Sequence, residues 1–402
     1  MINVFNWGLA CESLLGGGLI INKSIPQLNN FVYMLCLLSS WLLIHTLVIN
    51  KRGAFLTNLF VILLASVILA IKTKSLLIFY VFFELSVVPI TLIVFLFGYQ
   101  PEKLRACLHL VLYTVVSSLP LLLFIILIGE AFINLFPIHN CLSALPITLC
   151  FMIKRPMYVL HTWLPKAHGE APVGGSILLA GVLLKLGSYG LMIFLPYINI
   201  NPLITFFFRI TLLGSWLRSL TCLRQGDMKA LIAYSSVVHM SVVIIGLLNG
   251  SELGYSCAII MVLGHGVTSP FIFAMAYWLY ESSHSRLMTN NLRMRPLMTW
   301  CFFGLISLNM SVPPSISVWA EVMMAACVLF TMRYSIFLIL GYFFLGALYN
   351  LHLYTACIHS KYSQWHKNID NKSLISIGQT LFLCYSSIFC LDLFHLSSFF
   401  TS

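Results

Sequence analysis

Six ionisable residues lie inside apolar stretches of the sequence, where a charge is unexpected. They are Glu84, Lys154, Lys185, His239, His265 and Glu321. One charge at the centre of a bilayer costs at least about 3 kcal/mol, so each of these side chains must be neutral or face the interior of a helix bundle. Inside a bundle, burial and neighbouring charges change the pKa of such groups, so protons can pass between them. These residue types therefore predict a path for protons or other ions.

The two acids have almost entirely apolar neighbours. Glu84 lies in Phe82-Phe83-Glu84-Leu85-Ser86, and Glu321 lies two turns beyond Pro314 in Val318-Trp319-Ala320-Glu321-Val322. A carboxylate at this depth needs a partner, which favours a functional role. The alternative for each acid is a neutral side chain that makes only a structural hydrogen bond.

Lys185 shares one helix face with small residues. Gly174, Gly181, Lys185 and Ser188 follow one another at spacings of seven, four and three residues, which places them on one side of a helix. Small residues let a neighbouring helix approach, so we expect the Lys185 ammonium to point into the bundle. The alternative is that the side chain extends to the membrane surface beyond Gly190.

Lys154 and the two histidines are each open to two interpretations. Lys154 precedes Arg155 and Pro156, which can simply mark the end of a helix at the membrane surface. His265 lies between two glycines, and His239 ends the polar run at residues 234–239. Imidazole exchanges protons readily near neutral pH, which suits a relay, but a histidine in a bundle is also a common structural hydrogen-bonding residue.

Long apolar stretches must position these residues. A membrane helix needs about 20 apolar residues, so the chain of 402 residues predicts an all-α, polytopic transmembrane bundle of about 13 helices. The first stretch is the weakest, because it contains Glu12 and three successive glycines. The stretches fall roughly at residues 2–21, 28–49, 54–71, 75–98, 104–128, 142–164, 173–193, 203–222, 229–248, 252–280, 297–332, 336–357 and 375–397.

Two of the predicted helices are interrupted. Arg155-Pro156 and then Pro165 interrupt one, and Pro313-Pro314 divides the stretch at 297–332. Backbone groups freed at a break must contact protein or water, so we expect both breaks to be buried in protein. Broken helices in the two halves of a transporter mark the ion path, so we predict inverted repeats. The predicted parts are N-terminal accessory helices at 1–53, repeats at 54–193 and 194–358, and a C-terminal loop and helix at 359–402.

The composition excludes a water-soluble protein, because 60% of the residues are hydrophobic and only 8% are charged. The net charge of +11 comes mostly from basic residues in short connections, where they anchor helix ends, so it does not indicate nucleic-acid binding.

The 12 cysteines show no CxxC spacing and are typical of small core residues. No cleavable signal peptide is predicted, because the first apolar stretch lacks a basic start. Nucleotide-binding and metalloprotease motifs are absent from the sequence, so we expect this chain to hold no cofactor or metal itself.

The most specific stretch reads KRPMYVLHTWLPKAHGEAP at residues 154–172 and SILLAGVLLKLGSYG at 176–190. It resembles the subunit 4 family of NADH dehydrogenase, the antiporter-like membrane subunits of respiratory complex I. Further matches to this family lie at Phe83-Glu84, residues 227–236, Gly264-His265-Gly266 and Pro313-Pro314-Ser315.

The resemblance implies two inverted five-helix repeats around a central hydrophilic axis that carries protons. It also implies that Glu84 and Lys154 meet as a coupling switch and that Lys185 and His265 share one polar axis. By motif match, Glu84 is similar to the family's membrane glutamate, Lys154 to its paired lysine, Lys185 to its bridging lysine, His265 to its relay histidine and Glu321 to its terminal acid. His239 matches a family position as well.

The setting implied by the resemblance is the mitochondrial inner membrane, where the family's subunit couples NADH:ubiquinone electron transfer to proton pumping. The expected partners are other membrane-arm subunits, including sister antiporter-like subunits, and lipids. NADH, FMN, iron–sulfur clusters and ubiquinone are expected in partner subunits. Two other functions stay open: an independent cation/proton antiporter, and a scaffold in which buried charges only fix helix packing.

Two residues depart from the family pattern. Arg155 and Gly169 stand where apolar and larger residues are expected. Arg155 places a second cation beside Lys154, which disfavours a protonated Lys154 unless Arg155 faces another way. The region ahead of Glu84 is also short, so we expect a family accessory helix to be missing or replaced by another subunit.

Overall fold

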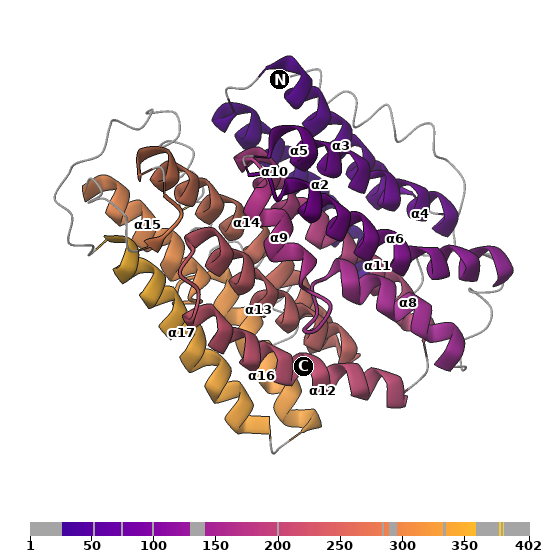
Figure 1. The fold of residues 1–402 in the computed structure, drawn as a ribbon. Coiled ribbons are helices and arrows are strands. Elements are labelled where there is room, and N and C mark those ends of the chain that lie inside the picture. The colour runs from indigo at the N-terminus through magenta and orange to yellow at the C-terminus, as the bar shows by residue number, and fades with distance from the viewer. Residues whose placement is uncertain are drawn as a thin grey trace.

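The chain folds into a bundle of helices (Figure 1). The computed structural model describes residues 26–50, 53–73, 75–98, 100–128, 141–198, 201–283, 285–288, 296–332 and 335–358, together with Gly378 and Leu381. Its helices are α2 (Pro26–Ile49), α3 (Ala54–Lys72), α4 (Leu76–Leu85), α5 (Val87–Phe97), α6 (Lys103–Ile128), α8 (Cys141–Lys154), α9 (Trp163–Glu170), α10 (Val173–Leu178), the π-helix η2 (Leu179–Leu183), α11 (Leu184–Phe194), the 3-10 turn η3 (Leu195–Tyr197), α12 (Asn201–Leu223), α13 (Met228–Leu248), α14 (Glu252–Ser283), α15 (Pro296–Asn309), α16 (Ile316–Thr331) and α17 (Ile336–Ile358).

The predicted all-α, polytopic membrane fold is confirmed. Within the described ranges, nine helical segments are long and apolar enough to cross a membrane, and α8, α15 and α16 are shorter apolar helices. The predicted stretch at 2–21 and nearly all of the stretch at 375–397 lie outside the described residues. The division into accessory helices and two repeats stays a prediction.

The centre of the bundle is formed by α10, η2, α11, α13 and α14. Nearly every residue of α11 and α13 is buried by the rest of the chain. Helix α14 packs against α13, α16, α10 and α2, and in Figure 1 it lies with α13 between the helices of the first half and those of the second half. Polar side chains on these central helices therefore face protein rather than lipid.

The first predicted break is present between α8 and α9. Helix α8 ends at Lys154, because Pro156 has no N–H to continue the ladder and also disfavours helical backbone at Arg155. Pro165 was predicted as part of the interruption, but it lies in the first turn of α9, where no N–H partner is needed. Residues 155–157 are buried as expected, whereas Val159 and Thr162 are exposed on the surface of this chain.

The second predicted break is present between α15 and α16. Met310 and Val312 donate backbone hydrogen bonds to carbonyls in the last turns of α15, and Ser315 donates to the Val312 carbonyl. Residues 312–314 of this break are exposed on the surface of this chain, so their burial in protein stays a prediction. Pro313 and Pro314 have no backbone N–H, so neither residue needs a hydrogen-bond acceptor for it at this break.

Two irregularities were not predicted, and each adjoins a candidate residue. The stretch at 75–98 was predicted as one helix, but Ser86, two residues after Glu84, separates α4 from α5. Pro89 supplies the reason, because its ring clashes with the carbonyl of the residue four positions earlier. The π-helix η2 ends two residues before Lys185. Such π segments are rare and frequent at functional sites.

Candidate functional site

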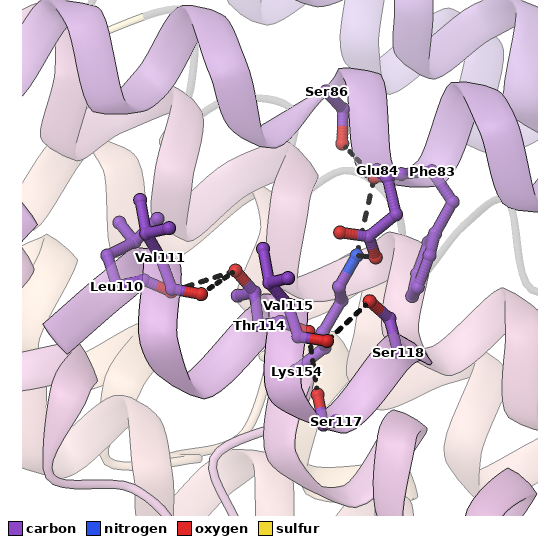
Figure 2. Close-up of polar contacts among 10 residues, drawn as sticks. All are labelled: Phe83, Glu84, Ser86, Leu110, Val111, Thr114, Val115, Ser117, Ser118 and Lys154. Carbon is purple, nitrogen blue, oxygen red and sulfur yellow. Dashed lines mark hydrogen bonds and ion pairs between the residues drawn. The ribbon is translucent and has the colours of Figure 1, made fainter. Parts of the chain in front are cut away.

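Glu84 and Lys154 form an ion pair between α4 and α8, as predicted (Figure 2). The distance from Lys154 Nζ to Glu84 Oε1 is 2.6 Å. Lys154 also donates to the Phe83 carbonyl at 3.3 Å, and its Nζ lies 3.1 Å from the centre of the Phe83 ring. The ammonium group is therefore held by a carboxylate, a carbonyl and an aromatic face, which together replace its hydration shell.

The pair lies at the edge of the chain rather than at its centre. The Glu84 side chain is 20% exposed and the Lys154 side chain 8%. Figure 2 shows Ser117 and Ser118 of α6 beside the pair, and both hydroxyls donate to carbonyls of their own helix. Their oxygens can still accept a hydrogen bond. The surroundings of the pair are thus polar on the α6 side.

Arg155 faces away from this pair. Lys154 points to α4, whereas the backbone and Cγ of Arg155 lie against Gly187 of α11. Arg155 is fully buried, and none of its three guanidinium nitrogens has a hydrogen-bond partner among the described residues. Because Arg155 and Lys154 face different ways, the charge of Arg155 need not disfavour a protonated Lys154.

Lys185 and His265 meet at the centre of the bundle. Lys185 Nζ lies 3.0 Å from His265 Nδ1 and donates to the Ala180 carbonyl of η2 at 2.6 Å. Ser269 lies one turn beyond His265 and places its hydroxyl 3.4 Å from the same ring nitrogen. A Cβ atom at Gly266 would lie 3.2 Å from Lys185 Cε, so the glycine permits this close approach. Lys185 thus points into the bundle, as its face of small residues predicted.

His239 and Glu321 continue from His265 toward the second broken helix. The ring centres of His239 and His265 are 5.7 Å apart. His239 Nδ1 lies 3.8 Å from Glu321 Oε1, which is too long for a direct hydrogen bond. Glu321 accepts a hydrogen bond from the Tyr342 hydroxyl at 3.0 Å. We call the four residues Lys185, His265, His239 and Glu321 the relay line.

A cavity of about 230 Å³ adjoins the far end of the relay line. Its lining includes His239, Asn309, Ser311, Glu321 and Tyr342. This volume holds several water molecules, and the lining supplies the polar partners that such waters need. Water can therefore bridge the 3.8 Å between His239 and Glu321.

A second cavity lies between Lys154 and the helix that carries Lys185, and it is smaller and less polar than the cavity at His239 and Glu321. This cavity of about 30 Å³ is lined by Lys154 and Phe83 and by Leu179, Leu183 and Leu186. This volume has room for about one water molecule. No hydrogen bond in the described part of the chain joins Lys154 to Lys185, so the ion pair and the relay line are separate groups.

The structure therefore places the six predicted residues in two groups, the Glu84–Lys154 pair and the relay line. Tyr342 and the Phe83 ring were not predicted as participants. An aromatic residue in an apolar helix gives no sequence signal of its own, because such residues mostly pack in cores. The only available signal was adjacency, since Phe83 directly precedes Glu84.

Comparison with known proteins agrees with this architecture. A family model described as "NADH:quinone oxidoreductase/Mrp antiporter, TM" matches residues 73–347. A protein named NADH-ubiquinone oxidoreductase chain 4 from Lumbricus terrestris is 38% identical over 358 residues, which are 85% of this chain and 78% of that protein. The protein of the same name from Ceratitis capitata is 38% identical over 349 residues, which are 82% of this chain and 78% of that protein.

Solved structures share the fold at lower identity. A chain of respiratory complex I from Thermus thermophilus with bound NADH has a TM-score of 0.76 at 20% identity, covering 89% of this chain and 79% of that one. A chain of the Mrp complex from Dietzia sp. has a TM-score of 0.72 at 16% identity, covering 86% and 67%. At these identities the likeness shows the fold alone.

Proposed function

The chain belongs to the NADH:quinone oxidoreductase/Mrp antiporter family of membrane subunits, and from this premise we propose that it is the proton-translocating chain 4 of an NADH–ubiquinone oxidoreductase. The curated relatives that carry this name match most of the chain at 38% identity. We propose that this complex lies in the mitochondrial inner membrane. NADH, flavin, iron–sulfur clusters and ubiquinone belong to its partner subunits, and this chain carries no redox step.

The observation that carries the proposal is the relay line. Its four residues come from α11, α14, α13 and α16, which lie far apart in sequence. Lys185 Nζ nevertheless lies 3.0 Å from His265 Nδ1, the two histidine ring centres are 5.7 Å apart, and His239 Nδ1 lies 3.8 Å from Glu321 Oε1. Protons move along such chains of donors and acceptors, whereas metal ions need several oxygen ligands at one point. The described residues include no cluster of three His, Cys, Asp or Glu side chains that could hold a metal.

The proton transfers follow from the order of the groups. The Lys185 ammonium gives a proton to His265 Nδ1, which leaves a neutral amine and an imidazolium. The imidazolium passes a proton to His239, and water in the adjoining cavity carries it to the Glu321 carboxylate. Lys185 then takes up a new proton, and Glu321 releases its own on the far side.

The Glu84–Lys154 pair controls this sequence by its charge. While the two groups touch, Coulomb attraction in a low-dielectric setting keeps the proton on Lys154. Separation of the pair removes that attraction, and the uncompensated charge of Lys154 then favours movement of the Lys185 proton away from it, toward His265. Redox work in the partner subunits supplies the energy that separates the pair.

The native particle that contains this chain tests the proposal. We expect the chain to co-migrate with NADH-oxidising and quinone-binding subunits when the membrane is solubilised and its complexes are weighed by native mass spectrometry. A free oligomer of this chain, with sodium-dependent or potassium-dependent proton exchange in vesicles, would instead identify an independent antiporter. A complex of normal mass that pumps normally without Lys185 would identify a scaffold.

A further inference from the structure

A serine follows the end of α15 at the second break, in a backbone conformation that favours glycine. Ser311 N donates to the Leu308 carbonyl at 3.3 Å, and Val312 N donates to the Ser307 carbonyl at 3.1 Å. These two bonds form a Schellman motif, in which Ser311 takes the position where glycine is usual. The φ angle of Ser311 is 54°, in the left-handed region. Glycine would end the helix without strain, so the end of the helix does not by itself explain a serine here.

The hydroxyl of Ser311 adjoins the large cavity at the end of the relay line. Ser311, His239 and Glu321 all line this cavity of about 230 Å³. Ser311 Oγ is buried and has no hydrogen-bond partner among the described residues, and the same holds for both ring nitrogens of His239. A buried polar atom without a partner is costly, so such atoms around a cavity indicate bound water. The volume is large enough for several water molecules.

Two other polar side chains of the lining use their donors elsewhere. The Asn309 amide donates to Asn350 Oδ1 at 2.8 Å, and the Tyr342 hydroxyl donates to Glu321 Oε1 at 3.0 Å. Most of the remaining lining is apolar and includes Met310, Val318, Val322 and Phe343. Ser311 therefore supplies a hydroxyl in this lining that no described residue occupies.

The distance between His239 and Glu321 shows why a third partner matters. His239 Nδ1 lies 3.8 Å from Glu321 Oε1. Two hydrogen bonds of about 2.8 Å each do not fit end to end in this distance, so a bridging water must lie beside the line that joins the two atoms. Two partners alone leave it free to move around that line. A third hydrogen bond, on the side of the cavity, fixes its place.

We propose that Ser311 is a positioning residue that holds the water molecule through which His239 passes its proton to Glu321. The proposal rests on the function proposed above. A buried water typically makes about three hydrogen bonds. Here the water accepts one from the His239 ring, donates one to the Glu321 carboxylate and donates one to Ser311 Oγ.

The transfer moves one proton and leaves the water unchanged. The His239 imidazolium gives the proton on Nδ1 to the water, and the water gives one of its own protons to Glu321 Oε1. His239 becomes neutral, and Glu321 becomes a carboxylic acid. Ser311 exchanges no proton, since its hydroxyl only orients the water.

The simpler alternative is that Ser311 only ends α15. For that role the hydroxyl is dispensable, and glycine is the better residue because it is not strained in the left-handed region. The two interpretations therefore predict opposite results for Ser311→Gly. The alternative predicts normal proton uptake, whereas the proposal predicts slower uptake in a subunit that is at least as stable.

The first test removes the hydroxyl in two ways in the assembled complex. Ser311→Ala keeps the Cβ atom and its strain, whereas Ser311→Gly relieves the strain. We expect both to slow NADH-driven proton uptake in vesicles about threefold, because the water loses one of its hydrogen bonds. Ser311→Gly should also resist thermal inactivation at least as well as wild type. The amount of complex on native gels normalises each rate.

Ser307→Ala is the matched control for these two variants. Ser307 lies one turn earlier on α15, donates its hydroxyl to the Gly304 carbonyl of the same helix and does not line the cavity. We expect this variant to take up protons at the wild-type rate.

The second test restores a polar group and measures the transfer itself. Ser311→Asn can hold water through its amide and tolerates the left-handed region, so we expect uptake within about twofold of wild type. In Ser311→Ala and Ser311→Gly we expect a larger solvent deuterium isotope effect on uptake than in wild type, because transfer through the loosened water then limits the rate.

The proposal is overturned if Ser311→Gly takes up protons at the wild-type rate, if Ser311→Asn is as slow as Ser311→Ala, or if the isotope effect does not change. Normal uptake in a Lys185→Met complex would instead overturn the proposed function itself.

Discussion

The Glu84–Lys154 pair and the relay line consist of similar side chains but differ in construction. The pair is one short contact of 2.6 Å at the edge of the chain, and Glu84 is 20% exposed. The relay line runs through the buried centre, with a 3.8 Å gap beside a cavity of about 230 Å³. A short ion pair has two distinct states, made and broken, whereas a line with gaps conducts only when water fills them. From this comparison we propose that the pair switches and that the line conducts.

Removal of Lys185 should have the largest effect, because protons enter the relay line at this residue in the proposed sequence of transfers. Lys185→Met keeps the length of the side chain but removes both its contact with His265 and its bond to the Ala180 carbonyl. We expect proton uptake driven by NADH to fall at least about tenfold in vesicles that carry the assembled complex.

Lys166→Met is the matched control for this variant. Lys166 is an exposed lysine of α9 that contacts His109 and belongs to neither group. We expect it to leave proton uptake within about twofold of wild type, as for a surface pair. Equal rates in the Lys185 and Lys166 variants would show that the line does not conduct.

Glu84→Gln tests the switch. The amide keeps the shape and can still accept a hydrogen bond from Lys154, but it removes the charge that holds the proton on the ammonium. We expect NADH:ubiquinone turnover and proton uptake to fall together, by about threefold to tenfold. Wild-type values for both, with full assembly, would show that Glu84 is structural and that the switch lies elsewhere.

Glu84→Ala separates charge from packing at the same position. It removes the charge and also leaves a cavity beside Phe83, so we expect less assembled complex than with Glu84→Gln. The comparison uses the amount of complex on native gels at equal expression. Equal assembly of the two variants would mean that the site repacks around the missing side chain.

The two groups also differ in how well the sequence predicts them. All six residues stand out, because a charge within an apolar stretch is costly wherever it lies. The break after Lys154 follows from Pro156, and the same reasoning applied to Pro89 predicts the break at Ser86. The π-helix before Lys185 contains no proline or glycine pair that would predict it, and it packs against α14. Tyr342 and the gap between His239 and Glu321 depend on distances between helices, which no single sequence contains.

Tyr342→Phe should have a smaller effect, confined to the end of the relay line. It removes the hydroxyl that donates to Glu321 at 3.0 Å and keeps the ring that lines the large cavity. Water in the adjoining cavity can replace this hydrogen bond, so we expect a net loss of about 1 kcal/mol and a slowing of proton uptake by about fivefold or less. An effect as large as that of Lys185→Met would mean that Tyr342 itself carries the proton and that the line has five members.

The smallest effect should come from Val159, which lies in the break that ends at α9, five residues after Lys154. Its φ angle is 80°, in the left-handed region, and its side chain is 63% exposed. A β-branched residue is strained there by about 1 to 2 kcal/mol, whereas glycine is not. Part of this gain is lost, because glycine has more conformational freedom to lose on folding. We therefore expect Val159→Gly to raise the stability of the assembled subunit by about 1 kcal/mol and to leave proton uptake unchanged. The rate of thermal inactivation measures the change in stability. Val159→Ala keeps a Cβ atom, which is what disfavours the left-handed backbone conformation, so it should not raise the stability in the same way. If Val159→Gly instead slows proton uptake without changing stability, the strain at the break belongs to the switch, and the Glu84–Lys154 pair does not act alone.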